Sequence, residues 1–189
     1  MGNRPGEKFK RNYKRLIVVI SILALAVLVA IMYQDFRQRQ VSIALFVALF
    51  AILCIEAYTM QSNFMSLLKN FLLNAGFVFV QLGCIKVYFL LKNKKNTPVI
   101  DTYIGMGDVL FFFISCIAFS VGNFVMFYLI SLITALIGAI AYMRIKNAKD
   151  FEIPLAGIMS SIMSLCIGYK LIDGSLNFYQ DTLLLSFLK

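Results

Sequence analysis

Two aspartates in this sequence have the type and the setting that acid–base chemistry at a membrane surface requires. One belongs to a Gly-x-Gly-Asp element, in which Gly105 and Gly107 precede Asp108 at the start of an apolar segment. A carboxylate beside hydrocarbon loses hydration and is costly to keep there, which makes it a candidate functional group. The glycines carry no side chain and let backbone, water or substrate approach closely. The other aspartate is Asp35, which follows an earlier apolar run.

Two carboxylates that lie together share one proton more readily than both ionise. That state suits hydrolysis of a peptide bond, because one carboxylate takes a proton from water while the other, protonated, polarises the carbonyl. The chemistry needs neither a metal nor a histidine, and the chain contains no histidine. We therefore expect Asp35 and Asp108 to form a catalytic pair that uses no metal and no cofactor.

Each aspartate also has a plainer interpretation. Asp35 stands beside Arg37 and Arg39 and is compatible with a solvated loop charge, the two arginines contacting substrate or lipid. Asp108 is compatible with a cap at the N-terminus of a helix, a position that aspartate often occupies. Asp101, seven residues earlier, is a rival for the second carboxylate, although it lies in a polar stretch.

The composition places the chain in a membrane. Hydrophobic residues make up 61% of the 189 positions, and several apolar runs approach the roughly 20 residues that cross a bilayer as a helix. The net charge of +9 comes from cations clustered at the ends of these runs. Such clusters are typical of topology signals and of contacts with membrane lipids, so we expect no nucleic-acid partner. The four cysteines fall in separate apolar runs, which predicts small buried side chains and no disulfide framework.

The apolar runs predict an all-α integral membrane protein, a bundle of about six transmembrane helices. We expect a basic N-terminal tail over residues 1–15 and the six-helix domain over residues 16–172. Residues 173–189 form a C-terminal tail whose mixture of polar and apolar residues suits the membrane interface. Gly122 and Asn123 are expected to form a tight turn. The predicted spans are residues 16–32, 41–60, 71–91, 104–121, 124–143 and 153–172.

The number of spans places the two aspartates relative to each other. Asp35 follows the first predicted span and Asp108 opens the fourth, so two complete spans separate them and both emerge on the same side of the membrane. Neighbouring helices of a compact bundle can then bring them together. Glu56, near the far end of the second span, belongs to the opposite side, where we expect an interfacial position.

At these residues the chain resembles the prepilin peptidases, membrane aspartic peptidases that process type IV prepilins, and relatives such as the preflagellin peptidases. That family carries an Asp followed by basic residues after its first core span, and a GxGD element that opens a later one. The corresponding residues here are Asp35, Arg37, Arg39, Gly105, Gly107 and Asp108. A third similarity is the run Ile153-Pro154-Leu155-Ala156-Gly157, which is similar to the Ile-Pro segment entering the family's last core span.

The resemblance implies a membrane-embedded aspartic endopeptidase that removes leader peptides from pilin-like or pseudopilin precursors at the cytoplasmic face of the inner (cytoplasmic) membrane. Asp35 and Asp108 are then catalytic, and Gly105 and Gly107 shape the site. The chain departs from the family at Val41-Ser42-Ile43, where Ile-Pro-Asn is common, and at Leu110, where Lys is common; both positions concern substrate positioning. Because the methylase domain of bifunctional members is absent, we expect cleavage without N-methylation.

Two other classes of function remain open. A small ion- or proton-coupled transporter would use Asp108 and Glu56 as proton or cation sites, although the middle of the spans offers a sparse polar lining. A catalytically silent membrane assembly protein would keep the fold without the activity.

Overall fold

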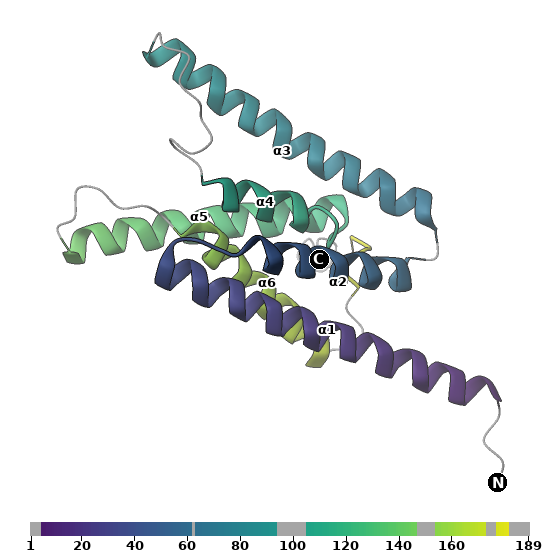
Figure 1. Ribbon diagram of the computed structural model, residues 1–189. Coiled ribbons are helices and arrows are strands. Elements are labelled where there is room, and N and C mark those ends of the chain that lie inside the picture. The colour runs from purple at the N-terminus through teal and green to yellow at the C-terminus, as the bar shows by residue number, and fades with distance from the viewer. Residues whose placement is uncertain (1–4, 62, 94–104, 147–153, 173–176, 182–189) are drawn as a thin grey trace, which may run out of the picture.

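The computed structural model describes residues 5–61, 63–93, 105–146, 154–172 and 177–181. These residues form six α-helices and no β-strand (Figure 1). The prediction of an all-α fold is therefore confirmed. In chain order the helices are α1 (Pro5–Gln38), α2 (Ile43–Met60), α3 (Phe64–Asn93), α4 (Met106–Ser115), α5 (Val121–Lys146) and α6 (Leu155–Ile172).

Five of the six described helices are long and apolar enough to cross a bilayer, which makes the chain a multi-pass membrane protein. The exception is α4, whose 10 residues extend over about half of the roughly 30 Å hydrocarbon core. Large apolar side chains such as Val47, Ile133 and Leu165 are exposed on the helices, as contact with lipid allows. The candidate spans are Asn12–Gln38, Ile43–Met60, Phe64–Lys92, Val121–Ile145 and Leu155–Ile172.

The prediction of a full span over residues 104–121 is wrong, because a turn follows the short helix α4. In this turn the side-chain amide of Asn74 donates hydrogen bonds to the carbonyl oxygens of Cys116, at 3.0 Å, and Phe119, at 3.1 Å. These bonds satisfy carbonyl groups near the end of the helix, where a helix leaves its last carbonyls unpaired. Cys116 and Phe119 are both buried by protein. The apolar run thus reflects burial inside the bundle rather than passage through lipid.

The start of α5 also differs from the prediction, because Gly122 and Asn123 are helical instead of forming a turn. Residues 177–181 fold back onto this end of the helix. Oδ1 of Asp181 accepts hydrogen bonds from the Gly122 N–H, at 3.1 Å, and from the Ser120 hydroxyl, at 2.6 Å. A carboxylate from the C-terminal segment thereby caps the N-terminus of α5, which lets the helix begin earlier.

Helix α1 extends beyond its predicted span at both ends. It begins at Pro5, inside the predicted basic tail, and it continues past residue 32 through Asp35. The prediction that Asp35 lies in a connection is therefore wrong, since no Gly or Pro interrupts the helix there. The helix ends at Arg39, whose φ of 52° is left-handed and whose N–H donates to the carbonyl oxygen of Asp35 at 3.0 Å. This is a left-handed C-terminal cap.

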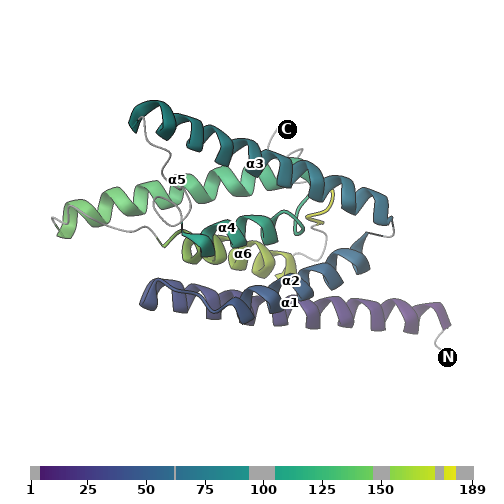
Figure 2. The ribbon, with the colours of Figure 1, turned by 45° about the horizontal axis from the view of Figure 1, so that its top comes forward.

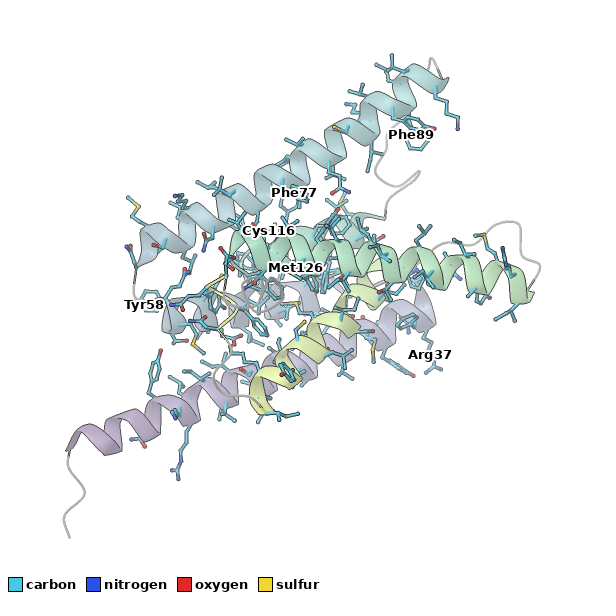
Figure 3. The ribbon with its side chains drawn as sticks, turned by 180° about the vertical axis from the view of Figure 1, so that it is seen from behind. Arg37, Tyr58, Phe77, Phe89, Cys116 and Met126 are labelled. Carbon is cyan, nitrogen blue, oxygen red and sulfur yellow. The ribbon has the colours of Figure 1, made fainter. Side chains whose placement is uncertain are left out.

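The packing brings three helix ends to one end of the bundle. Helix α6 packs most extensively on α1 and also on α5, and α3 runs along the outside (Figure 2). The C-terminal end of α1 and the N-terminal ends of α4 and α6 lie together (Figures 1 and 2). The C-terminal ends of α2 and α6 lie at the opposite end. In Figure 3, Arg37 and Tyr58 mark these two ends. The core between them includes Leu28, Leu49, Phe111, Phe124 and Met159.

Candidate active site

Asp35 and Asp108 meet at the first turn of α6. The backbone N–H of Ala156 donates to Oδ1 of Asp108 at 2.8 Å, and the N–H of Gly157 donates to Oδ2 of Asp35 at 2.5 Å. Because consecutive amide nitrogens are at most about 3.7 Å apart, the two bonded oxygens lie within roughly 9 Å of each other. We call Asp35 and Asp108 the carboxylate pair.

The first turn of α6 suits this role for reasons that hold for any helix. Its leading N–H groups have no partner within the helix, and the helix dipole adds partial positive charge at this end. Pro154, just before the helix, cannot continue a helix backward into the preceding segment. The two amides that follow Leu155 are left free to bind anions, which is how helix N-termini hold carboxylates and phosphates.

The structure gives both aspartates contacts beyond their plainer interpretations. Asp35 is 7% exposed and is bonded to α6, so it is not a solvated loop charge. Asp108 is not the N-cap of α4, because Gly105 occupies that position, and its Oδ1 bonds across to Ala156. The rival residue Asp101 lies outside the described residues.

Burial and charge act together on Asp108, which lies outside the five spanning helices. Burial is the largest effect and raises the pKa of Asp108 to about 6, whereas the hydrogen bond from the Ala156 backbone lowers it. The charge of Asp35 raises this pKa further, and a backbone hydrogen bond at Gly105 lowers it. The charge of Asp35 therefore disfavours ionisation of Asp108, as expected where two carboxylates lie near each other.

The two glycines of the GxGD element have different surroundings. A Cβ on Gly105 would lie 3.3 Å from Oδ2 of Asp108, so the absent side chain leaves room for this carboxylate. A Cβ on Gly107 would meet only the ring of Phe46, at 3.7 Å, which is ordinary van der Waals contact. The expectation that the glycines leave space for Asp108 thus has a geometric basis at Gly105 and not at Gly107.

The two arginines next to Asp35 also have different surroundings. Arg37 is exposed, donates to the hydroxyl of Tyr33 and lies 5.6 Å from the centroid of its ring. Its side chain points outward at the end of α1 (Figure 3). Arg39 closes the helix through its backbone, one turn beyond the Asp35 carboxylate. Both remain predicted contacts for substrate or lipid.

An apolar groove of about 290 Å³ opens beside the GxGD element, between α2, α3 and α4. Phe46 belongs both to this groove and to the contact with Gly107, and Leu110 lines it two residues after Asp108. The groove therefore begins next to Gly107 of the GxGD element. Its lining consists of Ile43, Phe46, Val47, Phe50, Phe71, Leu110, Phe113 and Ile114.

The expectation that Glu56 is interfacial is wrong. Glu56 is 3% exposed, and its Oε1 lies 2.5 Å from the Nζ of Lys170, which is 6% exposed. The hydroxyl of Ser21 donates to the same oxygen at 3.2 Å. Glu56 does lie at the end of the bundle opposite Asp35, but α1 and α6 enclose it there. We call Glu56 and Lys170 the buried ion pair.

Sequence reasoning missed the two amides of α6 and the buried ion pair. The sequence did carry a signal for the ion pair, because the second and sixth predicted spans end on the same side of the membrane. For the amides the one signal was the Ile-Pro segment that precedes α6. Every residue except proline has a backbone N–H, so residue type does not otherwise show which amides bind a carboxylate.

The cysteines agree with the sequence in part. All four are free, as expected, and Cys116 is buried. Cys84 is exposed, because it lies on α3, which contacts the other helices at few points. Among the described residues, no three Cys, Asp or Glu side chains gather closely enough to hold a metal ion.

No protein-family model, curated protein or solved structure that was compared with the chain matches it.

Proposed function

We propose that this protein is a membrane aspartic endopeptidase whose catalytic groups are Asp35 and Asp108. One observation carries the proposal: carboxylates from α1 and α4 bind consecutive backbone amides of α6, which brings their bonded oxygens within roughly 9 Å of each other. Pairing of a buried and a half-buried carboxylate in this way is unfavourable for ionisation of both. It is the protonation state that acid–base hydrolysis of an amide uses.

In the proposed reaction, the ionised carboxylate removes a proton from a water molecule as its oxygen attacks the carbonyl carbon of the substrate. The protonated carboxyl gives its proton to the carbonyl oxygen, so that the intermediate carries no net charge. Collapse of this intermediate breaks the C–N bond: the departing nitrogen takes up the proton held by the pair, and one hydroxyl of the intermediate returns its proton to the pair as the carbonyl of the new carboxyl group forms. The two carboxyl groups together then hold one proton again.

We propose as substrates membrane-anchored precursors in which a short basic leader precedes an apolar helix, as in type IV prepilins and pseudopilins. This class comes from the resemblance, and the groove beside Asp108 supports it, because an apolar lining suits the apolar flank of a cleaved bond. Cleavage then takes place at the cytoplasmic face of the inner membrane.

Co-expression with a prepilin-like precursor tests the proposal. We expect the wild type to shorten the precursor, and Asp35→Asn and Asp108→Asn to leave it uncut, since asparagine keeps an acceptor for the α6 amides but cannot exchange a proton. Asp101→Asn is the matched control and should cleave normally. Normal processing by either variant of the pair would disprove the assignment. Ion flux into liposomes without cleavage would favour the transporter instead.

A further inference from the structure

Gly157 lies against Asp35 in a space where a side chain would be crowded. A Cβ on this residue would lie 3.0 Å from Oδ2 of Asp35, 3.3 Å from its Cβ and 3.3 Å from Cε2 of Phe36. A retreat of the Asp35 carboxylate that relieves this contact also lengthens its 2.5 Å hydrogen bond to the Gly157 N–H. The absence of a side chain and the hydrogen bond therefore depend on each other.

Another glycine of the same helix shows that this crowding is local. A Cβ on Gly168 would have no atom within 4 Å. Both residues lie within α6, and both have helical neighbours on each side. A glycine-to-alanine change therefore has the same intrinsic effect on the helix at either position, while only the change at Gly157 reaches a carboxylate.

The bond to Gly157 also determines what the next amide does. Ala156 and Gly157 are consecutive, so a first turn close enough to reach Asp35 presents the Ala156 N–H to Asp108 at the same time. Two like charges repel, and a pair held only by its own helices would move apart. Two donors on one rigid turn hold both carboxylates against that repulsion.

We infer that Gly157 is a positioning residue of the proposed peptidase, whose missing side chain lets α6 fix the separation between Asp35 and Asp108. The inference rests on the proposed function, because it assigns a role in that reaction. Gly157 takes no part in the chemistry itself. Its role is to let backbone amides, rather than side chains, set the distance over which the carboxylates share a proton.

Kinetics of Gly157→Ala and Gly168→Ala in the full-length protein test the inference. The probe is a synthetic peptide with a short basic leader before an apolar helix of about 20 residues. We expect Gly157→Ala to lower kcat by about tenfold to 100-fold with KM unchanged, since Asp35 must give way by a few tenths of an ångström and a misplacement of a full 1 Å at reacting groups lowers rates about 100-fold. Gly168→Ala should match the wild type. Equal kcat values for the two variants would overturn the inference.

A second variant separates the contact with Asp35 from the contact with Phe36. Phe36→Ala combined with Gly157→Ala removes the ring but leaves the clash with the carboxylate, so kcat should stay low. Recovery to the rate of Phe36→Ala alone would overturn the inference, because the ring would then explain the loss. The double variant also relieves part of the crowding, which keeps the test open if Gly157→Ala accumulates poorly.

Infrared titration of the carboxyl groups without substrate gives a readout that does not need activity. In the wild type and in Gly168→Ala we expect two well-separated protonation steps, and in Gly157→Ala steps that draw together as the carboxylates move apart. Identical titrations would overturn the positioning role. If the wild type cleaves nothing but Gly157→Ala changes the titration, the positioning role stands and the proposed function fails.

Discussion

Helix α6 meets a polar cluster at each of its ends, and the two clusters are built in opposite ways. At its N-terminus two groups of like charge, Asp35 and Asp108, are held near each other by neutral amide donors. Near its C-terminus two opposite charges, Glu56 and Lys170, contact each other directly. The two carboxylates together are negatively charged, and binding of a proton lowers that charge. The ion pair of Glu56 and Lys170 is already neutral.

This difference separates a site that can react from one that holds helices together. A buried pair of opposite charges has little reason to take up or release protons, and removing one partner leaves an uncompensated charge. Lys170 has a second favourable neighbour, because its Nζ lies 5.6 Å from the ring centroid of Phe178. The buried ion pair thus joins α2, α6 and the C-terminal segment. In the proposed function the carboxylate pair serves the chemistry and not the stability of the fold.

The largest expected effect is on the rate of cleavage. Asp35→Asn and Asp108→Asn should each lower kcat by about 10²–10⁴-fold, the usual contribution of a general acid or base. Thermal unfolding in detergent should change little, or shift upward, because the substitution removes repulsion between like charges. A large loss of stability together with activity would show that the carboxylate pair is structural, like the buried ion pair.

The reverse pattern is expected at the other end of α6. Lys170→Met should destabilise the protein by about 3–5 kcal/mol, because Glu56 is left charged and unpaired. Combining it with Glu56→Gln should restore most of that stability. Denaturation of the purified single and double variants measures both effects. A double variant no more stable than the single one would contradict the view that charge compensation is what the pair provides.

The two clusters should also differ in their response to pH. The pKa of Asp108 is raised from 3.8 to about 6, so the folded protein holds this proton more tightly than the unfolded chain does. The stabilisation is present at acidic pH and is lost as the pH rises through about 6. Cleavage should decline over the same range, because the shared proton is lost.

Denaturation and cleavage measured from pH 4 to pH 8 check this expectation. Asp108→Asn should reduce the dependence of stability on pH in that window. The double variant Glu56→Gln/Lys170→Met should retain it, since its residues lie at the other end of the bundle. If the pH dependence of stability were lost in Glu56→Gln/Lys170→Met and kept in Asp108→Asn, the buried ion pair and not Asp108 would be the group that titrates.

The smallest expected effects concern the glycines of the GxGD element. Gly105→Ala should lower kcat by about threefold to tenfold, since its Cβ, 3.3 Å from Oδ2 of Asp108, displaces the carboxylate by only a few tenths of an ångström. Gly107→Ala should stay close to the wild type, because its Cβ meets only Phe46 at a normal distance. Steady-state kinetics on both variants test the ranking. The opposite order would mean that Gly107, not Gly105, keeps the approach to Asp108 open.

The amino-acid sequence by itself determined the broad architecture of this protein. Its long apolar runs require helices that satisfy their backbone in lipid. The number of complete spans between Asp35 and Asp108 then requires both to emerge at the same end. Residue type at Asp108 and its glycine neighbours was enough to nominate a reactive carboxylate, because charge beside hydrocarbon is costly wherever it occurs.

The tertiary structure alone decided how long α4 is, what holds the carboxylates and where Glu56 finds its partner. Hydropathy measures how apolar a segment is and cannot distinguish burial in protein from burial in lipid, so residues 104–121 resembled a span although α4 covers only Met106–Ser115. The groups that bind Asp35 and Asp108 are backbone amides, which every residue except proline possesses. Only the packing of α6 against α1 and α4 selects the amides of Ala156 and Gly157.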